Sequence, residues 1–249
     1  FMEVITRQSK GMPGRIEDLL DFCVHEGLLE PTTHGWIVHE QENLGGLFPE
    51  SMTQMYARNV ERLSQDARSV LRVVAAAISP VPLEALAAVT GLEEGVISRA
   101  LAELRRSDLV EDAAEGWYPA HSAVRDAADD ADTALHDALL RWYEEHPPAG
   151  DTPVLLAHHA LRSSHPERAP EPLIAGAEYR ERRYDYAGAE QMLRDAHELL
   201  PADDVERRFA VLESLSRLNN ILGRRADEQE FLEEMLVIAA QSNSPARLG

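Results

Sequence analysis

Residues 64–121 decide the fold class, and they run SQDARSVLRVVAAAISPVPLEALAAVTGLEEGVISRALAELRRSDLVEDAAEGWYPAH. Apolar residues recur at helical spacing in three successive segments, which breaks at Ser79-Pro80 and Gly91 separate. The pattern then changes to alternation around Glu115-Gly116, which is typical of a small β-hairpin. Three helices followed by a hairpin is the order of a winged-helix domain. The three helices are expected over residues 64–78, 83–89 and 94–106.

The residues before this stretch predict further helices and one short strand. Residues 13–29, PGRIEDLLDFCVHEGLL, place their apolar side chains on one helical stripe, and Pro13 suits the first turn of that helix. Residues 35–39, GWIVH, are typical of a strand. Ser51 is expected to cap a further helix that continues to Leu63.

From Ser122 onward the pattern requires helices alone, and two segments resemble each other. Residues 176–201, GAEYRERRYDYAGAEQMLRDAHELLP, fit a tetratricopeptide repeat, because small residues stand where paired helices approach closely. Residues 218–240, LNNILGRRADEQEFLEEMLVIAA, form a looser second copy. We expect Ala226, Leu232 and Met235 to take the packing positions of that copy.

Composition and charge exclude several classes of function. The formal net charge is −20, from 44 acidic and 24 basic residues, and such a surface repels nucleic-acid backbones and anionic lipid. Cys23 is the single cysteine, which excludes disulfide frameworks and cysteine-based metal sites. The sequence has no apolar run of the ~18 residues that a membrane span needs, and no secretory signal. We therefore expect a cytoplasmic protein with no membrane contact.

Five segments in order carry a resemblance to a known family. The first is Gly11-Met12-Pro13 with the helix that follows it and Gly27-Leu28-Leu29. The others are FPESMTQMYARNVERLSQDARSVLRVVAAA (48–77), YPAHSAVRDAA (118–128), ALHDALLRWYEE (134–145) and LLAHHALRSSHPERA (155–169). In this order they resemble the bacterial signal-transduction ATPases with numerous domains. Each segment alone is weakly specific, and the likeness is weakest over the last forty residues.

The resemblance implies a domain division and two nucleotide contacts. Residues 1–50 would form the helical lid of an ATPase module, residues 51–127 the winged helix, and residues 128–249 the helical repeats. The proline of the family's Gly-x-Pro segment packs against adenine, which maps onto Pro13. The family's winged-helix histidine contacts the nucleotide's phosphates, which maps onto His121. ATP or ADP is thus expected as a ligand of the full-length protein.

The chain departs from the family at the phosphate-binding loop. It contains no G-x-x-x-x-G-K-[ST] segment, and its one lysine, Lys10, stands in another context. No complete catalytic site is therefore expected in this chain, and no cofactor is expected for the chain alone. Whether the parent protein is an ATPase, or also carries a Ser/Thr kinase or a DNA-binding output domain as family members do, stays open.

Three hypotheses for function remain. The first is a regulatory fragment that couples nucleotide state to the binding of a protein or ligand through the winged helix and the repeats. The second is a stand-alone helical scaffold for protein–protein interaction. The third is a DNA-binding regulator, in which residues 97–109, ISRALAELRRSDL, enter the major groove; the acidic charge disfavours it, so nucleic acid is not expected as a partner.

Each candidate site competes with a structural role. Pro13 also suits a plain helix start, and His121 a buried position that closes the wing. The aromatic and basic cluster of Tyr179, Arg180, Arg183 and Tyr184 is the best candidate for a partner contact, against a solvated helix end.

A metal site is not expected. His136, His158 and His159 lack the H-E-x-x-H spacing, and adjacent histidines are expected to point to different faces of a helix.

Overall fold

The computed structural model describes Leu20, Cys23, Val24 and residues 28–32, 35–39, 52–128, 132–148 and 150–241. The chain is mainly helical, with small two-stranded hairpins, which confirms the predicted fold class. Pro13 and Ser51, on which two of the predictions depend, lie outside the described residues. Among the residues that the structure describes, none of the helices combines the length and the apolar character needed to cross a membrane.

A hairpin precedes α4 (Met52–Glu61), and the described residues Leu20, Cys23 and Val24 before it are helical. Strand β1 (Leu29–Thr32) pairs antiparallel with β2 (Gly35–Val38), in a register that sets Leu29 opposite Val38. The Thr32 hydroxyl donates to the Gly35 carbonyl at 2.8 Å and closes the turn. The strand expected over residues 35–39 is therefore present, with a partner strand beside it.

The winged helix follows the predicted boundaries closely. It consists of α4 (Met52–Glu61), α5 (Gln65–Ala76), α6 (Leu83–Thr90), α7 (Glu94–Arg106), β3 (Val110–Ala113), β4 (Gly116–Pro119) and α8 (Ser122–Ala128). Ser64 caps α5, because its hydroxyl accepts the N–H of Ala67 at 3.2 Å. Gly91 ends α6 in the left-handed conformation, with φ of 70°.

The hairpin of the wing is anchored to the loop before α6. Val81 and Trp117 exchange backbone hydrogen bonds of 2.8 and 2.9 Å, so a third extended segment lies beside β4. Gly116 makes this possible: its φ is 142°, and a Cβ atom there would collide with the Val81 carbonyl.

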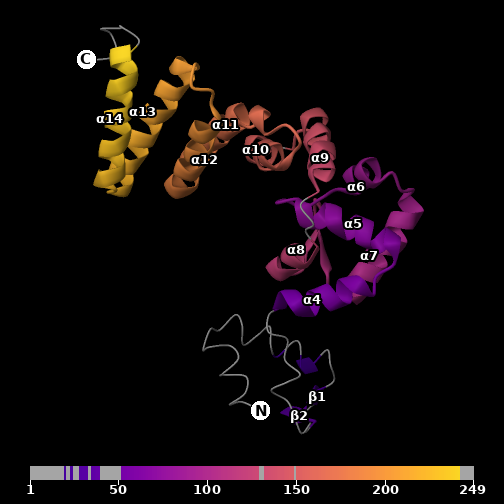
Figure 1. Ribbon diagram of the computed structural model, residues 1–249. Helices are drawn as coiled ribbons and strands as arrows, with labels where there is room; N and C mark the ends of the chain where they lie inside the picture. Colours follow the sequence, from indigo (N-terminus) through magenta and orange to yellow (C-terminus); the bar gives the residue numbers. More distant parts are fainter. Residues whose placement is uncertain are drawn as a thin grey trace.

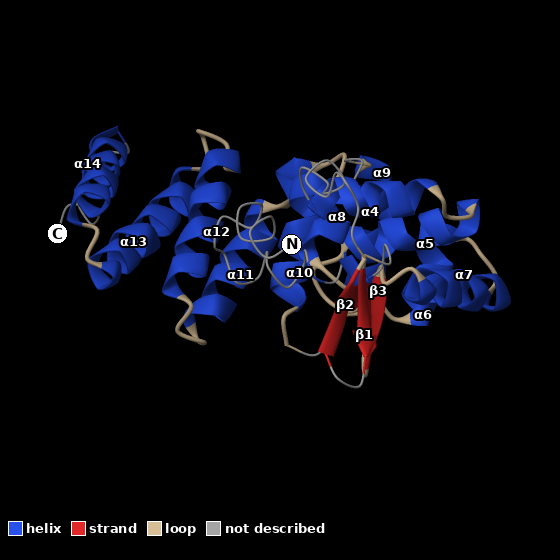
Figure 2. Cartoon of the chain, turned by 90° about the horizontal axis from the view of Figure 1, so that it is seen from below, coloured by secondary structure: helices blue, strands red, loops and turns tan. Residues whose placement is uncertain are grey.

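Helices alone follow the winged helix in the described residues, as predicted. They are α9 (Thr133–Glu145), α10 (Thr152–Arg162), a 3-10 turn (Pro166–Arg168), α11 (Pro170–Glu181), α12 (Tyr186–Leu199), α13 (Val205–Leu222) and α14 (Arg225–Gln241). Figures 1 and 2 show them set one after another in a row that leads away from the winged helix. Each helix packs on the next, as in a repeat protein.

The described residues form two apolar cores. The first fills the winged helix around α5, where Val70, Leu71 and Val74 are fully buried. The second runs through the repeat helices. Helices α9 and α10 contribute to both, since Leu139 and Leu155 belong to the first core and other residues of the same helices to the second.

The second repeat copy differs from the prediction. In α14 the buried residues are Phe231 and Ala239, whereas Leu232 is 45% exposed and Ala226 is exposed. Met235 packs partly against the core, as expected. The helix is rotated so that Phe231 faces inward, because an aromatic ring buries more apolar area than a neighbouring leucine.

Candidate functional site

His121, the expected phosphate contact, lies where α8 begins. Its Nδ1 accepts the backbone N–H of Ala123 at 3.0 Å, so the imidazole caps the helix. Its ring also stacks on Tyr56 of α4, with centroids 5.9 Å apart and planes at 25°. These contacts fix the ring between α4 and α8. Because Pro13 lies outside the described residues, the structure does not place the two expected nucleotide contacts relative to each other.

The aromatic and basic cluster gathers at the turn between α11 and α12. Arg183 donates to the Tyr179 hydroxyl at 2.8 Å, and its guanidinium lies 5.1 Å from that ring's centroid. Arg180 forms an ion pair with Asp185 at 2.7 Å. Tyr184 is 80% exposed and has a φ of 63°. The structure thus brings the four residues together, with both arginines engaged within the chain and Tyr184 directed to solvent.

A groove runs along the repeat helices, and sequence patterns did not mark it. Two cavities of about 460 and 640 Å³ share Glu171, Ala175 and Arg207. We call them together the repeat groove. Its walls come from α9, α10, α11, α12 and α13, so its lining is spread over about 75 residues of sequence and no local motif could reveal it.

The repeat groove has an apolar floor and an acidic rim. Leu156, Ile174 and Val211 line the floor. Its two arginines are paired with acidic neighbours, Arg168 with Glu144 and Arg207 with Asp204. Glu171 and Glu178 are exposed on the rim, and they give it a negative charge.

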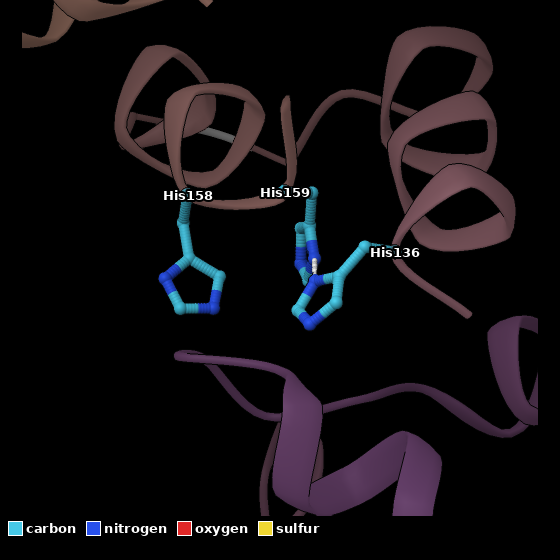
Figure 3. A group of neighbouring side chains, drawn as sticks. All are labelled: His136, His158 and His159. Carbon is cyan, nitrogen blue, oxygen red and sulfur yellow. Dashed lines mark hydrogen bonds between the residues drawn. The ribbon is translucent and has the colours of Figure 1, made fainter. Parts of the chain in front are cut away.

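Three histidines from α9 and α10 converge, contrary to the sequence prediction. His136, His158 and His159 each offer one ring nitrogen, and these atoms all lie within 4.8 Å of one another (Figure 3). His136 Nδ1 and His159 Nδ1 are 3.0 Å apart. The expectation that adjacent histidines must diverge is wrong here, because α9 crosses beside α10 and its His136 reaches the side chains of both.

Burial keeps two of these imidazoles neutral. It lowers the pKa of His159 to about 2, with smaller contributions from His158, His136 and Arg162. It also lowers the pKa of His158 to about 4, and here Arg162 is the next cause. Both rings are therefore uncharged at neutral pH, the form that donates or accepts hydrogen bonds and binds metals.

The histidines lie where the repeats meet the winged helix, at the end of α5 around Ala76. We call this contact the joint. His158 Nε2 donates to the Ala76 carbonyl, the last residue of α5, at 3.0 Å. Arg125 of α8 donates to the Ala75 carbonyl at 2.9 Å and also to that of Ala77. These donors satisfy carbonyls that a helix end leaves without partners. The end of α5 is thus held by both the winged helix and the repeats.

Comparisons with known proteins identify no family for this chain. Neither the scan against protein families nor the search of curated proteins finds a match. Among solved structures, the chain is similar to a Signal Transduction ATPase with Numerous Domains protein with a tetratricopeptide repeat sensor from Pyrococcus horikoshii, with a TM-score of 0.42 and 12% identity. The alignment covers 96% of this chain and 40% of that one, so the chain spans well under half of that protein. A likeness this distant establishes neither family nor function.

Proposed function

We propose that the chain is a regulatory interaction module whose repeat helices bind a protein segment and whose winged helix couples that binding to a nucleotide. In this proposal residues 1–50 belong to the lid of an ATPase module, residues 51–127 form the winged helix and residues 128–249 the tetratricopeptide-like repeats. The nucleotide-holding core is supplied from outside this chain. The proposal assigns no reaction to the chain itself.

The observation that carries the proposal is the repeat groove. Its two cavities, of about 460 and 640 Å³, lie along helices that pack as a repeat array, and such arrays bind partners on extended surfaces. The floor is apolar and the rim is acidic, which selects a basic, amphipathic segment over a nucleic acid. The aromatic and basic cluster of Tyr179, Arg180, Arg183 and Tyr184 stays a second candidate surface for the same partner.

The proposed regulation of partner binding by a nucleotide is inferred from the family-like order of the sequence segments. It is also inferred from the contact between the winged helix and the repeats at the end of α5. A ligand shifts a two-state equilibrium only through contacts that differ between the states. His121, held between α4 and α8, is the residue through which a phosphate would bias the packing of the winged helix. The hydrogen bond from His158 to Ala76 would carry that bias to α10.

A peptide selection tests the binding role. The immobilised protein should select basic, amphipathic peptides from a random library. Ala210→Arg, which fills the repeat groove from an exposed position on α13, should weaken the selected peptides' binding on the order of tenfold or more. The matched control is Ala102→Arg on the exposed side of α7, and it should bind as the wild type does.

Other outcomes separate the competing surfaces. Binding that survives Ala210→Arg and is lost in Tyr184→Ala would move the partner site to the cluster at the α11–α12 turn. Selection of no peptide, or equal loss in Ala102→Arg, would contradict the proposed role of the repeat groove. Binding that no nucleotide affects in the full-length protein would favour the stand-alone scaffold.

A further inference from the structure

We propose that His136, His158 and His159 form a binding site for a single divalent transition-metal ion of the zinc class. The site lies at the joint between the winged helix and the repeats, where α9 and α10 meet the end of α5 (Figure 3). It is separate from the repeat groove, whose lining contains none of the three histidines.

The geometry is close to that of a three-histidine centre. Imidazole nitrogens bind zinc at about 2.0–2.1 Å, so two of them on a tetrahedral ion stand about 3.3 Å apart. His136 Nδ1 and His159 Nδ1 are 3.0 Å apart, and each of the three rings offers one nitrogen within 4.8 Å of a nitrogen on each of the other two. Small rotations of the side chains would close the remaining distance. Two ligands come from α10 and one from α9, so an ion would cross-link the two helices.

Within the described residues, one ring nitrogen of the histidine cluster has no hydrogen-bond partner. His159 is fully buried, and its Nε2 finds no hydrogen-bond partner within the described part of the chain. Buried polar atoms are nearly always paired, so this Nε2 shows that the fold does not fully satisfy the His159 ring, whose Nδ1 contacts His136. With His136 also buried, the site excludes most of the solvent that competes for a metal. The low pKa values of His158 and His159 keep their nitrogens unprotonated at neutral pH.

The type of ligand selects the type of ion. Imidazole nitrogens suit zinc, cobalt, nickel and copper, whereas calcium and magnesium require oxygen ligands. The candidate group contains no carboxylate among the described residues, which disfavours the hard cations. Three protein ligands leave a fourth position for water, as in open zinc sites.

The ion must displace the hydrogen bond between His136 Nδ1 and His159 Nδ1, and it must also displace one contact of His158. The Nε2 of His158 donates to Ala76, and its Nδ1 accepts from Arg162 at 3.2 Å. The ion would replace one of these hydrogen bonds. The Arg162 guanidinium also repels a cation, and Arg125 adds to this on the side of α5. Arg162→Gln should therefore tighten metal binding, an effect that a merely structural histidine cluster does not predict.

The test titrates the tag-free protein, stripped with a chelator, with zinc chloride in a calorimeter and with cobalt chloride by visible absorption. We expect one ion per chain and a cobalt spectrum of nitrogen ligation. His159→Gln and His136→Gln should each weaken binding on the order of 100-fold or more, since even outer partners of a metal ligand are worth about 10–100-fold. His165→Gln removes an exposed histidine outside the cluster and is the matched control.

Folding of the variants is checked by circular dichroism, and the wild type supplies a second measurement that needs no variant. Zinc should raise the wild-type melting temperature, because a ligand of the folded state stabilises it by mass action. The proposal fails if the wild type binds no stoichiometric ion, or if binding persists in His159→Gln and His136→Gln. Loss of binding in His165→Gln alone would assign the ion to the surface and overturn it equally.

Discussion

At the scale of single residues, Gly116 is a position where the backbone conformation and its surroundings admit only glycine. It has a φ of 142°, and a Cβ atom would meet the Val81 carbonyl. Gly116→Ala should therefore lower the free energy of unfolding by roughly 3 kcal/mol, from backbone strain and from loss of the Val81–Trp117 bridge. Chemical denaturation measures this difference.

Gly91 provides the control for that prediction. It also has a positive φ, of 70°, but a Cβ atom there meets nothing within 4 Å. Gly91→Ala should cost only about 1–2 kcal/mol, the strain of a left-handed residue. Equal losses in the two variants would show that the contact with Val81 contributes nothing.

His159 makes stability depend on pH. Its folded pKa of about 2 lies below the ordinary value of 6.5, so the unfolded chain binds a proton that the folded chain does not. Its contribution is therefore complete above pH 6.5 and is lost as the pH falls toward the folded pKa. Going from about pH 7.5 to about pH 5.5 should cost about 1.4 kcal/mol through this group.

The measurement compares urea unfolding of the wild type and of His159→Gln at both pH values, with a chelator present. The variant should lose less stability by about that amount. Parallel pH dependences in the two proteins would mean that His159 is protonated in the folded state.

Some residue roles follow from sequence and others do not. Ser64 and Gly91 were predictable because a helix cap depends on its nearest neighbours along the chain. The meeting of His136 with His158 and His159 was not, because it depends on how α9 packs against α10.

At the scale of elements, the end of α5 depends on a side chain from α8. Arg125 is half-buried, and burial lowers the pKa of its guanidinium. It serves the carbonyls of Ala75 and Ala77. Arg125→Met should lower the free energy of unfolding by about 1.5–3 kcal/mol, the range for hydrogen bonds from a charged donor.

Thermal or urea denaturation checks this value against Arg99→Met. Arg99 is exposed on α7, and its loss should change stability by less than about 0.5 kcal/mol. If Arg125→Met is as mild as the control, water must serve the end of α5 instead.

The boundaries of elements were more predictable than their rotation. Helix α7 begins and ends at the predicted residues, because its apolar spacing and its flanking loops agree. The face that α14 buries was predicted wrongly at Leu232, because the repeat pattern of residues 218–240 is loose and does not specify the helix phase.

At the scale of the whole molecule, the sequence predicted the succession of helices and hairpins. It did not predict the surfaces that form where these elements pack together. Periodicity predicted the winged helix and the helical row after it. The repeat groove and the joint at Ala76 form only when helices distant in sequence stack. The coupling that we propose also acts at this scale: nucleotide state at the winged helix would bias the repeats through the contact of His158 with Ala76.

Hydrogen–deuterium exchange of the full-length protein, with and without ADP, tests the coupling between the winged helix and the repeats. ADP should slow amide exchange at α4 and α8 around His121 and also change it at α9 and α10, beyond the joint. His158→Leu should keep the first effect and weaken the second, because leucine has no donor for the Ala76 carbonyl. If ADP leaves the amide exchange of residues 133–162 unchanged in the wild type, the winged helix does not pass the nucleotide's effect to the repeats and the proposed coupling is wrong.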